Sequence, residues 1–139
     1  MKAARPFRIC AVVLVLFAVL HTFGFLSYKP TSAEGVAVMT AMDDVRFPFG
    51  NTTRTYGDLY RGFGFSVSAY LLLAALVAWR LPALLATSRE SFRALAIGLL
   101  GAQTAAVVLS FIFFAMPQAI FSLAVVACVV WGLVAARSS

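Results

Sequence analysis

Charged residues are scarce in this 139-residue sequence, and acidic residues are the scarcest. Charged side chains make up 12% of the chain, against about 25% in a soluble domain, and only five are acidic. Hydrophobic residues make up 63%, and the mean hydropathy is +0.96. One water-soluble core of this size cannot hide so much apolar surface, so the composition excludes a soluble globular domain and a disordered chain. It indicates an all-α integral membrane protein.

Cysteine and histidine are nearly absent too. Cys10 and Cys128 lie within apolar runs and outside any Cys-x-x-Cys or Cys/His cluster, so we interpret both as small core residues and predict no metal site. The GxSxG, P-loop, dinucleotide, HExxH and EF-hand patterns are missing from the sequence, so no motif implies a cofactor or catalytic residues. The basic excess lies at the ends of apolar runs, which favours lipid phosphates over nucleic acid as its partner.

Four apolar runs are long enough to cross a bilayer, which takes about 20 residues each. We expect spans over residues 9–28, 60–81, 94–116 and 118–135, with Pro82 ending the second and Pro117 making the turn before the fourth. The first run resembles a signal peptide at its start, but its apolar residues continue past His21, so we interpret it as a retained helix. The sequence predicts a single-domain, four-helix antiparallel bundle.

Basic residues gather on one side of these spans. That side carries Lys2, Arg5, Arg8, Arg80, Arg89, Arg93 and Arg137 against Glu90. The opposite side carries Lys29, Arg46, Arg54 and Arg61 against Glu34, Asp43, Asp44 and Asp58. By the positive-inside rule, we predict a bacterial inner-membrane protein with both termini in the cytoplasm and the 29–59 loop facing the periplasm.

The third span contains a run of small residues. Its members are Ala94, Gly98, Gly101, Ala102, Ala105 and Ala106. Lipid gives no hydrophobic drive between helices, so small residues that allow close approach mark the expected packing face. Leu99 is then expected to lie largely on another face.

The 29–59 loop is the only long polar segment. Thr31 and Glu34 fit a capping box, which predicts a short amphipathic helix to about Arg46 that covers the mouth of the bundle as a lid. Its expected apolar face is Val36, Met39, Met42 and Val45. Thr55 and Asp58 fit a second box, so the second span is expected to begin in water.

His21 is the only histidine, and it lies inside a span, roughly 10 Å below the outer interface. Ionisable residues inside a membrane are costly and often functional. Three interpretations remain open: a neutral imidazole bonded to a neighbouring helix, a group that transfers protons or binds a ligand, and an axial ligand of haem or chlorophyll. A bis-histidine haem is excluded within one chain.

Further polar residues extend this candidate site. Gln103, near the middle of the third span, needs a hydrogen-bond partner, and Tyr70 is a plausible one. Asp58 and Arg61 are three residues apart on a helix, which suits a salt bridge. The candidate ligand-binding residues are His21, Tyr28, Asp58, Arg61, Gln103 and Tyr70. An ordinary interfacial loop with balanced charges is the alternative interpretation of the loop residues.

The layout resembles small bacterial inner-membrane proteins of the DoxX-like kind and related uncharacterised families. The resemblance rests on His-x-x-Gly at 21–24, Tyr-Arg-Gly-Phe at 60–63, the polar outer loop and the hairpin of the last two spans. DoxX-like proteins are linked to quinone-coupled redox complexes. The resemblance implies a lipophilic ligand here.

We therefore expect a protein that binds a hydrophobic small molecule, quinone- or lipid-like, in a periplasm-facing polar pocket. Two alternatives stay open. The first is an accessory subunit of a larger membrane complex or a homo-oligomer, and the second is a small enzyme using His21 with Asp58 or Asp44. Charged rings and paired broken helices are missing from the spans, so a channel or transporter is the least favoured function.

Overall fold

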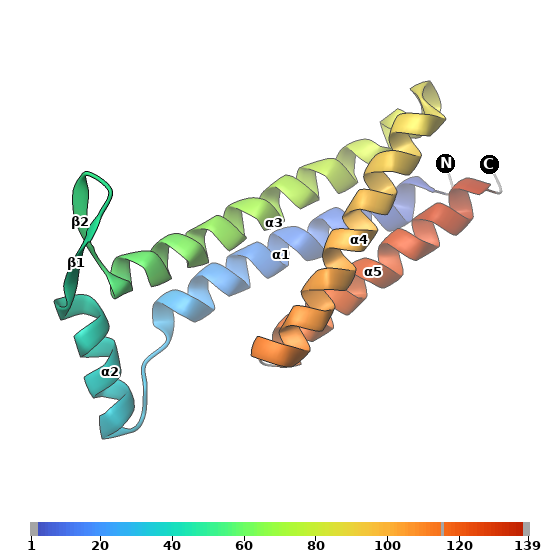
Figure 1. Ribbon diagram of the computed structural model, residues 1–139. Coiled ribbons are helices and arrows are strands. Elements are labelled where there is room, and N and C mark those ends of the chain that lie inside the picture. Colours follow the sequence, from blue (N-terminus) through green and yellow to red (C-terminus); the bar gives the residue numbers. More distant parts are fainter. Residues whose placement is uncertain (1–2, 115, 138–139) are drawn as a thin grey trace. The chain divides into compact units, whose positions relative to one another are not determined.

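The computed structural model describes residues 3–114 and 116–137. The elements within these residues are α1 (Ala4–Ser27), α2 (Ala33–Asp44), β1 (Arg46–Phe49), β2 (Thr52–Thr55), α3 (Tyr56–Thr87), α4 (Arg89–Phe113) and α5 (Met116–Arg137) (Figure 1). Four of these helices, α1, α3, α4 and α5, are long and apolar enough to cross a membrane. The element order fits the predicted helical fold and indicates a multi-pass membrane protein.

All four long helices begin before their predicted spans; α3 and α5 end later than predicted, whereas α1 and α4 end earlier. The predictions that Pro82 ends its helix and that Pro117 lies in the turn before the last helix were both wrong. Pro82 does not end its helix: α3 continues for five residues, and Ser88 N–H then donates to Leu84 O at 2.7 Å. A proline removes only one backbone N–H donor from a helix, so the hydrogen bonds of the last turn of α3 still form after Pro82. Pro117 lies inside the first turn of α5, where a helix has no use for the missing N–H. The preceding helix, α4, ends at Phe113.

The chain divides into two compact units. The terminal unit comprises Met1–Phe17 and Leu71–Ser139, and the central unit comprises Ala18–Tyr70. The division falls within two long helices, so α1 and α3 each have one segment in the terminal unit and another in the central unit.

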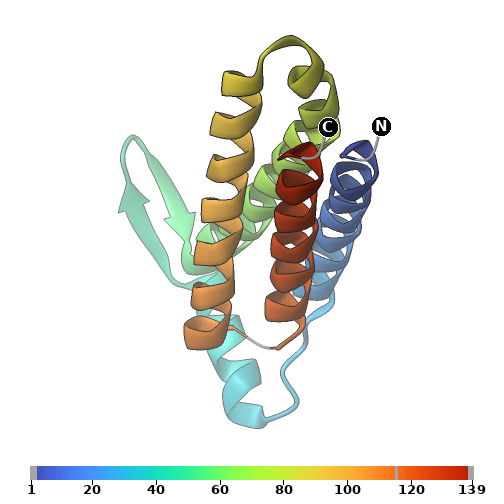
Figure 2. The same cartoon turned by 90° about the vertical axis from the view of Figure 1, so that its right-hand side faces the viewer.

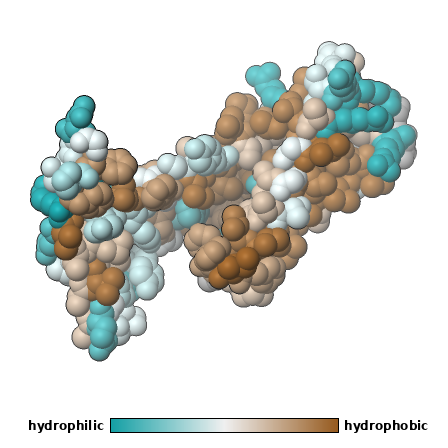
Figure 3. Space-filling model, viewed as in Figure 1, coloured by the Kyte–Doolittle hydropathy of each residue, from teal (hydrophilic) through white to brown (hydrophobic). Residues whose placement is uncertain are grey.

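In the terminal unit, α4 and α5 run antiparallel side by side (Figures 1 and 2). The buried residues of α4 are Phe92, Ala96, Leu99, Gln103 and Ser110, and those of α5 are Ala119, Ser122, Val125, Val129, Gly132 and Ala136. Steps of three and four residues alternate along most of both series, as in a coiled-coil seam. Brown, hydrophobic residues cover much of the visible outer surface, as expected for lipid contact (Figure 3).

The predicted packing face of α4 was wrong. Ala94, Gly98 and Ala102 are exposed in the structure, whereas Leu99 is buried. The reason is geometric: four residues advance an α-helix by about 400°, so a stripe with four-residue spacing turns away from a straight partner. The alternating spacing keeps Leu99 and Gln103 on the seam.

The N-terminal half of α1 completes the core of this unit. Phe7, Cys10 and Leu14 are fully buried, and the Phe7 ring meets Phe92 edge-on at 5.6 Å between centroids. Cys10 and Cys128 are free thiols, buried and half-buried respectively. The interpretation of Cys10 as a core residue is confirmed.

In the central unit, the predicted loop helix exists as α2, but its cap is one residue later than expected. Ser32, not Thr31, accepts the Gly35 N–H at 3.0 Å. The expected apolar face is only half right, because Met39 and Met42 are half-buried while Val36 and Val45 stay exposed. The helix stops at Asp44, two residues before the predicted end.

A β-hairpin follows α2, and the sequence analysis did not predict it. Strands β1 and β2 pair antiparallel, with Arg46 opposite Thr55 and Phe49 opposite Thr52. Gly50 has a φ of 60°, the conformation that the first central residue of a two-residue type II′ hairpin turn requires. Pro48 within β1 obscured the strand, because proline is normally confined to edge strands. The fold is therefore helical with one small hairpin.

Candidate functional site

The start of α3 is fixed by a reciprocal pair of hydrogen bonds. The Thr55 hydroxyl accepts the Asp58 N–H at 3.0 Å, and the Asp58 carboxylate accepts the Thr55 N–H at 3.0 Å. This is the predicted second capping box, and it is confirmed. The positive end of the helix dipole also stabilises the Asp58 carboxylate there.

Arg61 joins this cap to α2. Its Nη1 donates to Asp43 Oδ1 at 2.9 Å, and its Nη2 donates to Asp58 Oδ1 at 3.2 Å. The predicted pair of Asp58 and Arg61 is therefore present, and Asp43 is an added partner from 18 residues earlier in the chain. The three groups carry a formal charge of −1. Because Arg61 already contacts two carboxylates, it acts first as the tie between α2 and α3.

Gly57 allows the end of α2 to lie against the first turn of α3. A Cβ atom built on Gly57 would overlap the Asp43 carboxylate and would lie 3.3 Å from the Met42 carbonyl oxygen. Any side chain at position 57 would therefore displace the carboxylate that Arg61 contacts. The glycine and the ion pairs form one junction.

Replacing Arg61 with glutamine is expected to loosen α2 locally. Its ion pairs are about half exposed, and such pairs contribute little to global stability. We expect hydrogen exchange at the α2 amides to become about two- to fivefold faster, while the exchange of α4 and α5 is unchanged. Arg46→Gln, which removes an exposed arginine with no ion pair among the described residues, is the control. Equal exchange in the two variants would contradict a role as a tie.

His21 continues the inward-facing stripe of α1. Leu14, Ala18, His21 and Phe25 follow one another at steps of four, three and four residues. The His21 imidazole is half-buried, its Nε2 atom is shielded from solvent, and its ring lies 5.5 Å from the Phe25 ring. The expectation that His21 faces away from lipid stays a prediction.

A hydroxyl pair links the two long helices of the central unit beside His21. Thr22 Oγ1 and Ser68 Oγ are 2.6 Å apart, and Thr22 also donates to Ala18 O at 2.9 Å. Ser68 is buried. In an apolar setting such a hydrogen bond holds two helices at a fixed rotation.

Aromatic rings lie against the same stretch of α1. The Phe25 ring meets Phe65 edge-on at 5.3 Å and Tyr60 edge-on at 6.3 Å between centroids. Gly64 lies directly beneath the Phe25 ring, since a Cβ there would come within 2.8 Å of it. We call Phe25, Tyr60 and Phe65 the aromatic cluster. With His21 and the hydroxyl pair, it combines flat apolar faces with hydrogen-bonding groups, which is the mixture found in small-molecule sites.

No protein-family model matches the chain, and neither a curated protein nor a solved structure matches it. Within the described residues, no three His, Cys, Asp or Glu side chains gather closely enough to hold a metal ion. The function therefore has to be argued from the residues themselves.

The six predicted site residues divide into three groups. Asp58 and Arg61 are in contact, and His21 is half-buried on α1. Tyr28 and Tyr70 belong to the same unit, but both are largely exposed, at 60% and 70%. Gln103 belongs to the terminal unit, on the seam of α4. There its buried Oε1 has no hydrogen-bond partner among the described residues.

Sequence reasoning missed Thr22, Ser68 and the aromatic cluster. Thr22 follows the histidine directly, and Ser68 is one of two serines in the first half of α3. The available signal was the hydroxyl of Thr22 next to the single histidine of the sequence. Its partner could not be identified, because pairing across two helices depends on their rotation.

Proposed function

We propose that this chain is a four-span protein of a bacterial inner membrane that binds a lipophilic small molecule beside His21. The ligand would be quinone- or lipid-like, and it would contact the aromatic cluster. The observation that carries the proposal is the convergence of the sole imidazole, the Thr22–Ser68 hydroxyl pair and three aromatic rings where α1 and α3 meet in the central unit.

The ligand's polar head is assigned to His21 rather than to Arg61. An imidazole donates or accepts a hydrogen bond according to its tautomer, which suits a carbonyl or a hydroxyl head group. Arg61 is engaged by two carboxylates, so it positions the α2 lid. The resemblance to DoxX-like proteins remains a prediction, and it is the reason for testing a quinone first.

The orientation proposed here follows the charges. The positive-inside rule places both termini in the cytoplasm and the central unit's α2 and hairpin in the periplasm. Support comes from the terminal unit, where the two ends of the described chain lie at the same end of the helices (Figures 1 and 2).

Replacing His21 with alanine is expected to abolish ligand retention. The purified protein would be incubated with ubiquinone in dodecyl maltoside, and bound quinone would be measured by native mass spectrometry. We expect at least about tenfold less bound quinone in His21→Ala, because a buried hydrogen bond to the head group is lost. Thr104→Ala is the matched control, since the Thr104 hydroxyl is exposed and bonds only its own helix, to Leu100 O at 2.8 Å. Unchanged retention in His21→Ala would refute the proposal.

One observation favours a second candidate function, an accessory subunit of a larger membrane complex. Ala94, Gly98, Gly101, Ala102 and Ala105 of α4 are all exposed. A Cβ atom on Gly98 or Gly101 would meet nothing within 4 Å. Small residues on a spanning helix let another helix approach closely. Isolation of the chain as a stoichiometric part of a complex would decide for this candidate.

A further inference from the structure

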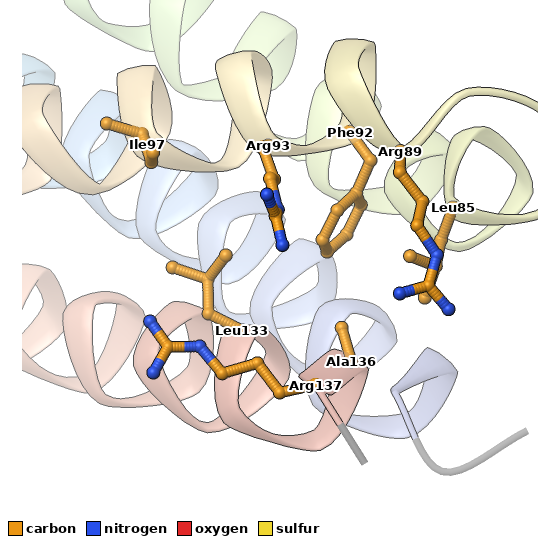
Figure 4. A pocket seen from close by; sticks show the side chains of 8 residues that line it. All are labelled: Leu85, Arg89, Phe92, Arg93, Ile97, Leu133, Ala136 and Arg137. Atoms are coloured by element: carbon orange, nitrogen blue, oxygen red, sulfur yellow. The ribbon is translucent and has the colours of Figure 1, made fainter. Parts of the chain in front are cut away.

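The terminal unit contains a cavity whose character differs from the site around His21. It measures about 440 Å³ and lies where α3 ends, α4 begins and α5 ends. This volume is within the range of small-molecule sites. Figure 4 shows Arg89 and Arg93 extending from α4 and Arg137 from the last turn of α5, with Phe92 and Leu133 between them and Ile97 farther along α4.

Three guanidinium groups share this cavity, and none has a counter-charge among residues 3–114 and 116–137. Among the described residues, none of the three makes an ion pair or a hydrogen bond, and Glu90, the acidic residue next to Arg89, makes no salt bridge. Like charges at one cavity repel each other, and a bound anion would convert that repulsion into attraction. Guanidinium groups match phosphate oxygens in geometry as well as in charge.

The remaining walls of the cavity are apolar. Phe92 is buried on the α4 seam, Leu133 lies between Arg93 and Arg137, and Ile97 extends the apolar surface along α4 (Figure 4). A small hydrated anion gains nothing from such walls. A ligand with a phosphate head and a hydrocarbon tail would use both parts of the cavity.

The cavity lies at the more basic end of the terminal unit. Teal, hydrophilic groups gather at that end in Figure 3, and the sequence places Arg5, Arg8 and Arg80 there as well. Basic pockets between spanning helices on the cytoplasmic side are typical binding sites for anionic lipid head groups.

We propose that this cavity binds the phosphate head group of an anionic phospholipid, with Arg89, Arg93 and Arg137 contacting the phosphate oxygens. Phe92, Ile97 and Leu133 would contact the beginning of an acyl chain. The site shares no residue with the proposed His21 site, so each proposal can fail without the other.

The test is binding of dioleoylphosphatidylglycerol to the full chain in dodecyl maltoside, followed by native mass spectrometry. The variant is Arg93→Gln/Arg137→Gln. The control is Arg5→Gln/Arg80→Gln, which removes the same charge from exposed positions at the same end but outside the cavity lining. We expect binding to be on the order of tenfold weaker in the first variant and within about twofold of wild type in the control. Thermal melting in the same detergent confirms that both variants are folded.

Two further arms separate a lipid from other sources of phosphate. Dioleoylphosphatidylcholine has the same acyl chains and no net charge, and it is expected to bind at least about tenfold more weakly. Inorganic phosphate at 10 mM is expected to displace little phosphatidylglycerol, because it cannot use the apolar walls. If phosphatidylglycerol binding weakens equally in both variants, the proposal is overturned, because the lipid would then be attracted by the whole basic end rather than by the cavity. Full displacement by inorganic phosphate, or no lipid binding at all, would overturn it too.

Discussion

Replacing Gly132 with alanine is expected to destabilise the terminal unit by about 1–3 kcal/mol. The new Cβ would lie 2.5 Å from Cζ and 2.6 Å from Cε2 of the Phe7 ring. The ring has no room to retreat, because Phe7 is fully buried and meets Phe92 edge-on at 5.6 Å. Denaturation in dodecyl maltoside, followed by circular dichroism, measures the loss.

Gly98→Ala is the matched control for this prediction. A Cβ atom at position 98 meets nothing within 4 Å, so the helix gains the ordinary advantage of alanine over glycine, up to about 1 kcal/mol. The double variant Gly132→Ala/Phe7→Leu tests the cause. If contact with the Phe7 ring causes the destabilisation, Gly132→Ala lowers the free energy of unfolding less in the Phe7→Leu protein than in wild type. A Gly132→Ala protein as stable as the Gly98→Ala protein would rule out this close packing.

Replacing Gly64 with alanine is expected to disturb the central unit and the His21 site together. The new Cβ would come within 2.8–3.0 Å of three atoms of the Phe25 ring. Phe25 is only half-buried, so its ring can turn aside, and we expect a loss of about 1 kcal/mol rather than more. The turned ring would leave Tyr60 and Phe65, so ubiquinone retention is expected to fall as well.

The control for this prediction lies two residues away. Gly62 has the same helical setting, and a Cβ atom there meets nothing within 4 Å. Gly62→Ala should keep both stability and quinone retention at wild-type levels or slightly above. If the two variants behave alike, contact between α1 and α3 at Gly64 is not what shapes the site.

The features that the sequence predicted correctly are local ones. The four long apolar helices follow from apolar runs long enough to cross a bilayer, and the α3 cap follows from Thr55 and Asp58 standing three residues apart. The ion pair of Asp58 and Arg61 obeys the same short-range rule. For the cap and the ion pair, residues within one turn determine the outcome, and for the long helices one continuous run of sequence does.

The features that could not be predicted from the sequence depend on the rotation of each helix and on contacts between residues far apart in the chain. Asp43 reaches Arg61 across 18 residues, and Thr22 reaches Ser68 across 46. The packing face of α4 was predicted wrongly because the prediction followed the small size of the residues rather than the three-and-four spacing that buries Leu99. The β-hairpin was missed because Pro48 outweighed the turn signal of Gly50.

The length of α3 has a consequence for where its charges lie. Its 32 residues extend about 48 Å at 1.5 Å each, whereas the hydrocarbon layer of a bilayer is about 30 Å thick. If α3 crosses a bilayer along its normal, about twelve of its residues project beyond the hydrocarbon layer, into the zone of glycerol and phosphate groups. If the first turns of α3 are the projecting part, Asp58 and Arg61 lie among water and lipid ester groups. There a charged side chain avoids most of the desolvation penalty that it would have in the hydrocarbon layer. In that arrangement, the extra turns of α3 would keep the junction with α2 outside the acyl-chain layer.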